Sequence, residues 1–442
     1  MYNKFIWISP FRWDKKLEGF ELLMDKLIIN GQKKLFGEVS ISGAKNAAVA
    51  VLPAAIMADD ICIIDNLPSI EDITSLFNTF EKMGIKCEFL DKHTLKIDSR
   101  NLENVSATYD EVKKIRASYY LLGALLGRFK KAEVSMPGGC NFGSRPIDLH
   151  LKGFKALGAE VTVTEDAVKL SAEKLTGATI YMDQVSVGAT INVMLAACLA
   201  EGTTIIENAA KEPHVVDTAN FLNIMGANIK GAGTDVIRIT GVEKLHGAEY
   251  TIIPDQIEAG TYMIAAAITG GDVVVKNIIP KHMDSLSAKL DEMNVTIEEG
   301  DDSIRVISDK PLKNVNVKTM SYPGFPTDLQ PQMAALLTVC MGENIITENV
   351  WDNRYQYIDQ LKKLGADVSI DGRIAKIQGV KKLTGNSVSA TDLRAGAAMI
   401  IAGLAAEGVT EISNVKYIDR GYEDVEHKFK SLGADIKRVK VD

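Results

Sequence analysis

The sequence LGADV, Leu364 to Val368, is one of six similar short sequences along the chain. The others are MGIKC at Gly84, LGAEV at Gly158, MGANI at Gly226, MNVTI at Asn294 and LGADI at Gly433, with spacings of 74, 68, 68, 71 and 68 residues between neighbours. Such regular self-similarity indicates repeated supersecondary units. We expect an amphipathic helix to end at each Gly or Asn, because both residues adopt the left-handed conformation that terminates helices.

Each unit opens with an apolar segment that predicts a buried helix. A β-rich run with near period-two alternation follows, such as TTIIENA at 203–209. A helix that is apolar all round must be buried on every side, so the six units predict two similar α/β domains of three units each, facing each other across a cleft. The apolar segments are 47–58, 118–129, 190–200, 260–270, 331–342 and 396–408.

Composition excludes several classes of function. The chain has 442 residues and a net charge of -8, whereas a general binder of nucleic acid or anionic membranes needs a basic face. An anionic ligand must therefore be held by a local basic site. The five cysteines have no paired spacing, which favours neither a disulfide framework nor a zinc site and fits a reducing cytoplasm. The apolar stretches, about ten to twelve residues long, are too short to span a bilayer.

Residues 1–23 have neither the continuous apolar core nor the cleavage site of a signal peptide. Leu17-Glu18-Gly19 is a tripeptide that a purine-rich ribosome-binding site encodes when read in frame. Our hypothesis is that 1–23 is an N-terminal extension that is not native and that translation starts at Met24. The alternative is a genuine amphipathic tail.

Unusual polar residues cluster immediately before the apolar helices. A helix start offers unpaired N–H groups and a partial positive charge, so several starts aimed into one cleft would hold a multiply anionic ligand. The alternative is that Ser42, Thr327 and Thr391 simply cap helices while the charges are solvated. The clustered residues are Lys45, Asn46, Arg116, Ser186, Asp328, Asp392 and Arg394.

Cys140 differs from the other cysteines because it lies in the glycine-rich stretch SMPGGCNFGSRPIDLH, residues 135–150. A thiol in such a loop beside Arg145 is expected to have a lowered pKa and to act as a nucleophile or proton donor. His150 is interpreted as a hydrogen-bonding residue on a helix face. The remaining cysteines, expected to be small core residues, are Cys62, Cys87, Cys198 and Cys340.

These motifs together resemble the UDP-N-acetylglucosamine 1-carboxyvinyltransferases, within the wider enolpyruvyl transferase family. The resemblance runs from about Met24 to the C-terminus and implies two domains, each an inside-out α/β barrel of three repeated units with buried helices. It implies transfer of the enolpyruvyl group of phosphoenolpyruvate to the 3-hydroxyl of UDP-N-acetylglucosamine, in the first committed step of peptidoglycan precursor synthesis. The motifs are SGAKNA, IRAS, PGGCNFGSRPIDLH, VSVGAT, GTTIIENAA, FPTDLQ, ATDLRA and IDRGYE.

The resemblance also implies roles for particular residues. Cys140 would donate a proton to the methylene carbon, form an adduct with phosphoenolpyruvate and be the target of fosfomycin, and Asp328 would help to deprotonate the 3-hydroxyl. Phosphoenolpyruvate would be held by Lys45, Asn46, Arg354, Arg394 and Arg420, with Asp392 supporting the arginines. The sugar nucleotide would be held by Arg116, Arg145, Pro146, Ile147, Asp148, Leu149, Gln184, Val185, Ser186, Val187, Asp328 and Val350.

The family pattern implies neither a cofactor nor a metal. The expected partners are the two small-molecule substrates, and the expected location is the cytoplasm. The sequence does not specify the oligomeric state. The expected domains are 24–44 plus 254–442, which is catalytic, and 45–253, which carries the mobile cysteine loop. Gln184 replaces a common lysine of the family, which implies a neutral phosphate contact and weaker nucleotide affinity. Gln256 replaces a common arginine, which puts a supporting or regulatory contact of the family in doubt. The alternatives are a 5-enolpyruvylshikimate-3-phosphate synthase and a catalytically silent paralogue that binds a sugar nucleotide.

Overall fold

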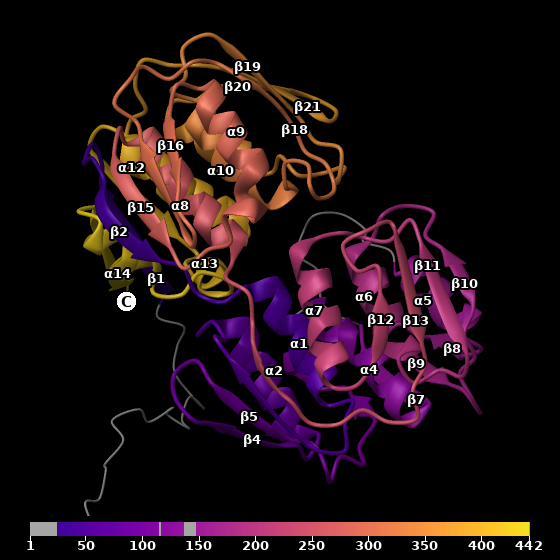
Figure 1. The fold of residues 1–442 in the computed structure, drawn as a ribbon. Coiled ribbons are helices and arrows are strands. Elements are labelled where there is room, and N and C mark those ends of the chain that lie inside the picture. The colour runs from indigo at the N-terminus through magenta and orange to yellow at the C-terminus, as the bar shows by residue number, and fades with distance from the viewer. Residues whose placement is uncertain (1–23, 115, 137–146, 442) are drawn as a thin grey trace, which may run out of the picture.

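Six four-stranded sheets form two α/β lobes in the computed structural model, which describes residues 24–114, 116–136 and 147–441 (Figure 1). One hydrophobic core, that of the first lobe, contains residues from Ala44 to Ile252. The core of the second lobe combines Leu27–Ile41 with residues from Ile257 to Ile436. The predicted fold class of two α/β units built from repeats is therefore confirmed.

The three sheets of the first lobe have the orders β14-β3-β5-β4, β6-β7-β9-β8 and β10-β11-β13-β12. Their strands are β3 (Ile61–Asp65), β4 (Lys86–Phe89), β5 (Leu95–Asp98), β6 (Ser106–Ala107), β7 (Lys131–Ser135), β8 (Glu160–Val163), β9 (Ala167–Ser171), β10 (Thr179–Tyr181), β11 (Thr203–Glu207), β12 (Asn228–Lys230), β13 (Val236–Thr240) and β14 (Glu249–Thr251). Every one of these strands lies between residues 61 and 251.

The sheets of the second lobe have the orders β16-β17-β15-β2, β18-β19-β21-β20 and β22-β23-β1-β24. Figure 1 shows the indigo strands β1 and β2 beside orange and yellow elements from the other end of the sequence. The strands are β1 (Met24–Asn30), β2 (Phe36–Ser40), β15 (Asp272–Lys276), β16 (Thr296–Glu299), β17 (Ser303–Ile307), β18 (Asn316–Lys318), β19 (Glu343–Thr347), β20 (Asp367–Asp371), β21 (Ile374–Gln378), β22 (Ser387–Ser389), β23 (Val409–Ser413) and β24 (Asp435–Val441).

One apolar helix per unit is almost completely buried, as the sequence predicts, because it has no polar face to expose to water. In the first lobe α4 packs against both α1 and α6, and in the second α8, α10 and α12 pack against one another. These helices are α1 (Lys45–Ala55), α4 (Tyr120–Phe129), α6 (Val187–Ala197), α8 (Gln256–Ile268), α10 (Gln330–Leu337) and α12 (Leu393–Ala405).

The remaining helices are shorter or amphipathic and cover the units. They are α2 (Glu71–Lys82), α3 (Asp110–Lys114), α5 (Asp148–Ala156), α7 (Pro213–Ile224), α9 (Asp284–Glu292), α11 (Ile358–Lys363), α13 (Lys416–Asp419) and α14 (Val425–Ser431). Three 3-10 turns accompany them: η1 (Arg116–Tyr119), η2 (Pro280–Met283) and η3 (Thr327–Leu329).

The residue at each repeat marker has a positive φ, which confirms the predicted left-handed helix stops. The φ values are 91° at Gly84, 95° at Gly158, 100° at Gly226, 69° at Asn294, 93° at Gly365 and 91° at Gly433. An L-residue with a Cβ is strained there, whereas glycine is not and asparagine is only mildly so. The shared backbone geometry therefore explains the recurring sequence.

An exchange of strands joins the two lobes. Within four units, the strand before the buried helix pairs in parallel with the strand after it, as β6 does with β7 around α4. Across the lobe boundary β2, which precedes α1, pairs with β15, and β14, which precedes α8, pairs with β3. The chain therefore crosses between lobes twice, and Gly43 and Pro254 form a β-bridge where the two crossings meet.

Two side-chain predictions are resolved by the structure. Ser42, Thr327 and Thr391 do not cap the helices that follow them, because Ala44, Leu329 and Asp392 occupy the N-cap positions of α1, α10 and α12, so the capping alternative is wrong. Cys62, Cys198 and Cys340 are buried and Cys87 is half-buried. Burial raises the pKa of Cys62 to about 11 and those of the other three to about 12, so all four are poor nucleophiles.

Candidate active site

Asp328 lies between two buried arginines at the start of α10. Its Oδ1 accepts a hydrogen bond of 3.2 Å from Arg354, and its Oδ2 accepts bonds of 3.1 and 3.3 Å from the guanidinium of Arg394. The Asp328 side chain is 30% exposed, whereas the two arginines are 3% and 5% exposed. Burial alone would raise the pKa of Asp328, but Arg394 and Arg354 outweigh that effect and hold the pKa well below its usual range.

Asp392 organises the neighbouring helix start. It is the N-cap of α12, and its carboxylate accepts the backbone N–H groups of Arg394 at 2.8 Å and of Ala395 at 3.1 Å. These bonds satisfy two of the unpaired donors of the helix and fix the backbone from which the Arg394 side chain extends. Asp392 thus supports Arg394 through the main chain.

A second pair of predicted cations meets at an acid that the sequence did not single out. Asp72, in the first turn of α2, accepts Lys45 Nζ at 2.8 Å and Arg420 Nε at 2.9 Å, and it is only 3% exposed. Although burial opposes ionisation of Asp72, Lys45 and Arg420 lower its pKa. Lys45 belongs to the first lobe and Arg420 to the second, so Asp72 joins the lobes.

Lys45 also connects the two carboxylate clusters. Its charge lowers the pKa of Asp328, and its backbone N–H donates to Asp255 Oδ2 at 2.9 Å. Asp255 is at the same time the N-cap of α8 in the second lobe. One acid therefore holds the starts of α1 and α8, which come from opposite lobes, at the crossing.

The segment IDRGYE, residues 418–423, brings Arg420 to this cluster. The hydroxyl of the buried Tyr422 lies 2.9 Å from Thr261 Oγ1, 3.2 Å from Gln332 Nε2 and 3.5 Å from the Arg394 guanidinium. A Cβ on Gly421 would lie 2.7 Å from Leu393 and 3.2 Å from the Lys45 stem. A side chain at position 421 would therefore displace Leu393 and crowd Lys45.

Residues predicted to hold the sugar nucleotide lie on both lobes. Ser186 is the N-cap of α6 and accepts the Ala189 N–H at 3.3 Å. Gln184 and Val185 beside it are exposed, and Val187 is half-buried. Val350, which is 38% exposed, follows β19 in the second lobe. One ligand that binds both groups would therefore have to contact both lobes.

Other predicted residues are described only in part. Asn46 is half-buried beside Lys45 at the start of α1. Asp148 is exposed, Ile147 is half-buried and Leu149 is 5% exposed at the start of α5. The interpretation of His150 is confirmed, because its Nδ1 lies 2.8 Å from Asn192 Nδ2. Cys140, Arg145 and Pro146 lie outside the described residues, as does the side chain of Arg116.

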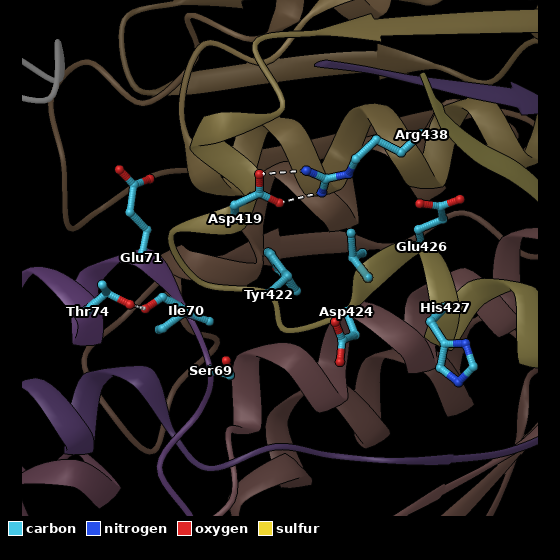
Figure 2. A pocket seen from close by; sticks show the side chains of 11 residues that line it. Ser69, Ile70, Glu71, Thr74, Asp419, Tyr422, Asp424, Glu426, His427 and Arg438 are labelled. Atoms are coloured by element: carbon cyan, nitrogen blue, oxygen red, sulfur yellow. Dashed lines mark hydrogen bonds and ion pairs between the residues drawn. The ribbon is translucent and has the colours of Figure 1, made fainter. Parts of the chain in front are cut away.

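A cavity of about 410 Å³ lies at the lobe boundary, on the same 419–424 segment (Figure 2). The first lobe contributes Ser69, Ile70, Glu71 and Thr74 at the start of α2, and the second contributes side chains from Asp419 to His427 together with Arg438. Figure 2 shows Arg438 paired with Asp419, at 2.6 and 2.9 Å. Of the predicted catalytic residues that the structure describes, Lys45, Asp328 and Arg420 do not line this cavity, so it is distinct from the candidate active site.

In residues 24–114, 116–136 and 147–441 no group of three or more His, Cys, Asp or Glu side chains is placed to hold a metal ion. Within the same part of the chain, no helix has the length and apolar character needed to cross a membrane.

Sequence reasoning missed Asp72, Asp255 and Tyr422. In the sequence, Asp72 and Asp255 look like ordinary acidic residues near helix starts, where the helix dipole favours a negative charge. The available signal was the position of Asp255 before an apolar helix, the same position that singled out Asp392. Tyr422 lies in a motif that was noted only for its arginine.

The chain is similar to known proteins over almost its whole length. The family described as EPSP synthase (3-phosphoshikimate 1-carboxyvinyltransferase) matches residues 29–429. UDP-N-acetylglucosamine 1-carboxyvinyltransferase 2 of Clostridium acetobutylicum is 60% identical over 95% of this chain and all of that protein. UDP-N-acetylglucosamine 1-carboxyvinyltransferase of Clostridium botulinum is 58% identical over 94% of this chain and all of its own length.

Solved structures show the same fold. The enolpyruvyl transferase NikO from Streptomyces tendae has a TM-score of 0.86 and 29% identity, and the match covers 95% of this chain and 100% of that chain. An EPSP synthase from Acinetobacter baumannii has a TM-score of 0.74 at 20% identity, and the match covers 94% of this chain and 100% of that chain. The chain therefore belongs to the enolpyruvyl transferase family, and within it to the group of the UDP-N-acetylglucosamine 1-carboxyvinyltransferases.

Proposed function

We propose that the protein transfers the enolpyruvyl group of phosphoenolpyruvate to the 3-hydroxyl of UDP-N-acetylglucosamine and releases phosphate, in peptidoglycan precursor synthesis in the cytoplasm. The observation that carries the proposal is Asp328 between Arg354 and Arg394, with Lys45 near enough to lower its pKa. This arrangement combines a base with the cations that a trianionic substrate needs. Relatives at 58–60% identity over their whole length support the choice of acceptor.

The proposed reaction is an addition followed by an elimination. The acceptor oxygen bonds to C2 of phosphoenolpyruvate while Asp328 takes the hydroxyl proton and Cys140 gives a proton to C3, which becomes a methyl group. Loss of a proton from that methyl group then re-forms the double bond as the C2–O bond to phosphate breaks. Lys45 and Arg420 would stabilise the leaving phosphate, whereas the role of Cys140 rests on the family resemblance alone.

The ion pairs of Asp328 suggest how it becomes a base. With two arginine partners its pKa is too low for it to accept a proton from an alcohol at neutral pH. The carboxylate and phosphate of phosphoenolpyruvate would compete for the same guanidinium groups. As Arg354 and Arg394 turn toward the substrate, the pKa of Asp328 rises, so binding of phosphoenolpyruvate prepares the base for the acceptor.

The domains proposed for these roles are 24–44 with 254–442, which supplies Asp328 and the arginines, and 45–253, which supplies Lys45 and carries the Cys140 loop. The core of the first lobe begins at Ala44 and ends at Ile252, whereas the core of the second lobe stops at Ile41 and resumes at Ile257, which supports this division. Substrates would bind between the domains, with the Cys140 loop closing over them.

The decisive experiment measures phosphate release from phosphoenolpyruvate with either UDP-N-acetylglucosamine or shikimate 3-phosphate as the acceptor. Release that depends on the sugar nucleotide is expected. Release only with shikimate 3-phosphate would favour the second candidate, an EPSP synthase, which the family description suggests. Release with neither acceptor would indicate a paralogue that binds a sugar nucleotide without turning it over.

A further inference from the structure

Glu348 is a completely buried carboxylate whose four hydrogen bonds come from hydroxyl and backbone groups. It follows β19 and is 0% exposed. Its Oε1 accepts Thr319 Oγ1 at 2.8 Å and the backbone N–H groups of Val350 at 2.8 Å and Trp351 at 3.1 Å. Its Oε2 accepts Thr327 Oγ1 at 3.0 Å. A buried charge is costly unless hydrogen bonds satisfy it, and these bonds do so.

The partners of Glu348 belong to two segments of the candidate active site. Thr327 directly precedes Asp328 in η3. Val350 and Trp351 begin the loop that leads to Arg354, whose guanidinium binds Asp328. Thr319 reinforces the connection, because its Oγ1 also accepts the Asn349 N–H at 2.9 Å. One carboxylate therefore ties the segment that carries the proposed base to the segment that carries one of its arginines.

We infer that Glu348 is a positioning residue that fixes Asp328 and the 350–354 loop relative to each other. The inference rests on the proposed function and adds a residue to which that function assigned no role. The two carboxylate oxygens of Glu348 hold different segments. Oε2 holds Thr327, and through it the base, whereas Oε1 holds the start of the loop on which Val350 would meet the sugar nucleotide.

Glu348 does not itself meet the substrate. Its side chain has no exposed surface, and both of its oxygens already accept hydrogen bonds. Any effect on turnover must therefore pass through its partners. That gives the inference a specific signature, because the two sides of the carboxylate are expected to affect different kinetic constants.

The test begins with Glu348→Gln, which keeps the shape but replaces one acceptor oxygen with an NH2 group that cannot accept from its former donors. We expect kcat to fall at least tenfold and KM for UDP-N-acetylglucosamine to rise. Thr327→Val removes the one donor to Oε2 found among the described residues and should lower kcat about tenfold, with KM for the acceptor within twofold of the wild type. Thr327→Ser, which keeps the hydroxyl, should recover most of the lost kcat.

Thr319→Val acts on the other oxygen and should mainly raise KM for UDP-N-acetylglucosamine. Thr338→Val is the matched control, because Thr338 is also 0% exposed and its hydroxyl donates to the Ala335 carbonyl at 2.7 Å in the same lobe. Thr338→Val should lower the melting temperature about as much as Thr327→Val and Thr319→Val do, without changing kcat or KM. Steady-state phosphate release and thermal unfolding provide all the measurements, and the threonine variants decide the question if Glu348→Gln fails to fold.

The outcomes separate the two levels of proposal. If the wild type releases phosphate with UDP-N-acetylglucosamine but Thr327→Val and Thr319→Val behave like Thr338→Val, Glu348 is only structural and the inference is overturned while the proposed function stands. If the wild type shows no release that depends on UDP-N-acetylglucosamine, the proposed function fails and the inference fails with it.

Discussion

Asp328 and Asp72 are each held by two cations, yet the two pairs connect different parts of the molecule. Asp328 collects two arginines of its own lobe, whereas Asp72 joins a lysine and an arginine from opposite lobes. Each carboxylate orients cations that would bind phosphoenolpyruvate in the proposed reaction. Removing either acid would take a carboxylate partner from two cations that are mostly shielded from solvent, which is more damaging than losing an exposed ion pair.

Cys140→Ser should nearly abolish phosphate release while leaving binding of UDP-N-acetylglucosamine largely intact. A serine hydroxyl is a far weaker acid than a thiol, so it cannot deliver the proton to C3 at neutral pH. Calorimetric titration with the sugar nucleotide and a turnover assay would measure the two properties separately. Loss of binding would mean that Cys140 has a structural role, and full activity after prolonged fosfomycin treatment would count against a reactive thiol.

Asp217 in α7 predicts a pH effect on stability. Burial raises its pKa to about 6, although Tyr250 OH donates to its Oδ1 at 2.6 Å. Because the folded pKa lies above the unfolded value of about 3.9, the folded state binds the proton more tightly, and stability falls as pH rises from about 4 to 6. The size of this effect is on the order of 2–3 kcal/mol.

Asp217→Asn cannot ionise and should remove that loss. Thermal unfolding would be measured for the variant and the wild type at pH 4, 5, 6 and 7. The free energy of unfolding of the variant should increase relative to that of the wild type up to about pH 6, and the difference should persist at pH 7. Other carboxylates titrate in both proteins and cancel in the difference. Parallel curves over the whole range would contradict a raised pKa at Asp217.

The sequence predicts which residues carry charge, but not which of them are buried together. Lys45 and Arg394 were identified by their positions before apolar helices, and Arg420 through a family motif. The role of Asp72 was not predicted, because its partner Arg420 is 348 residues away in the sequence. Glu348 gave no signal either, since an acid after a strand is usually solvated.

At the scale of elements, the repeat specifies each unit by a local rule. The left-handed Gly or Asn at each repeat marker ends the second helix of its unit, so these six stops could be located from the sequence. The exchange of β2 and β14 could not be predicted in this way. A short strand before a buried helix has the same pattern whether it pairs within its own unit or with the opposite one, and only the three-dimensional arrangement distinguishes the two.

Gly421→Ala tests the close packing of the turn that follows α13. The new Cβ would lie 2.7 Å from Leu393 and 3.2 Å from Lys45, so both side chains must move. We expect kcat/KM for phosphoenolpyruvate to fall about tenfold, which corresponds to ~1.4 kcal/mol of transition-state stabilisation. Wild-type kinetics would show that Lys45 does not depend on this contact.

Gly365→Ala is the control for that variant. It has open space around its Cβ but a φ of 93°, so the substitution strains the backbone without touching the site. It should lower stability by about 1–2 kcal/mol and leave turnover unchanged. Together the two variants separate a contact effect from a general loss of stability.

At the scale of the whole molecule, the first lobe is an insertion into the second. All strands of its three sheets lie between residues 61 and 251, whereas the second lobe needs β1 and β2 from the start of the chain. β1 lies between β23 and β24, and it pairs with β24 along its whole length from Met24 opposite Val441 to Asn30 opposite Asp435. The two lobes therefore depend differently on chain continuity.

A fragment of residues 45–253 should fold by itself, whereas 254–442 should not. Without β1 the sheet β22-β23-β1-β24 is broken in its interior, and β24 loses its partner. Urea unfolding followed by near-ultraviolet circular dichroism should give a cooperative transition for the first fragment only. A chain of 254–442 linked through a short loop to 24–44 should regain cooperativity, because Met24 and Val441 are neighbours; failure of this rearranged chain would contradict the prediction.

The pairing of β1 with β24 also has a consequence for synthesis. A ribosome makes β1 first and β24 last, at about 5–20 residues per second, so an apolar strand must wait tens of seconds for its partner. During that time the inserted lobe can fold, while Leu27 and Ile29, which end with no exposed surface, remain open to solvent. The nascent chain therefore presents a binding segment for chaperones near its N-terminus until the last seven residues of the second lobe emerge.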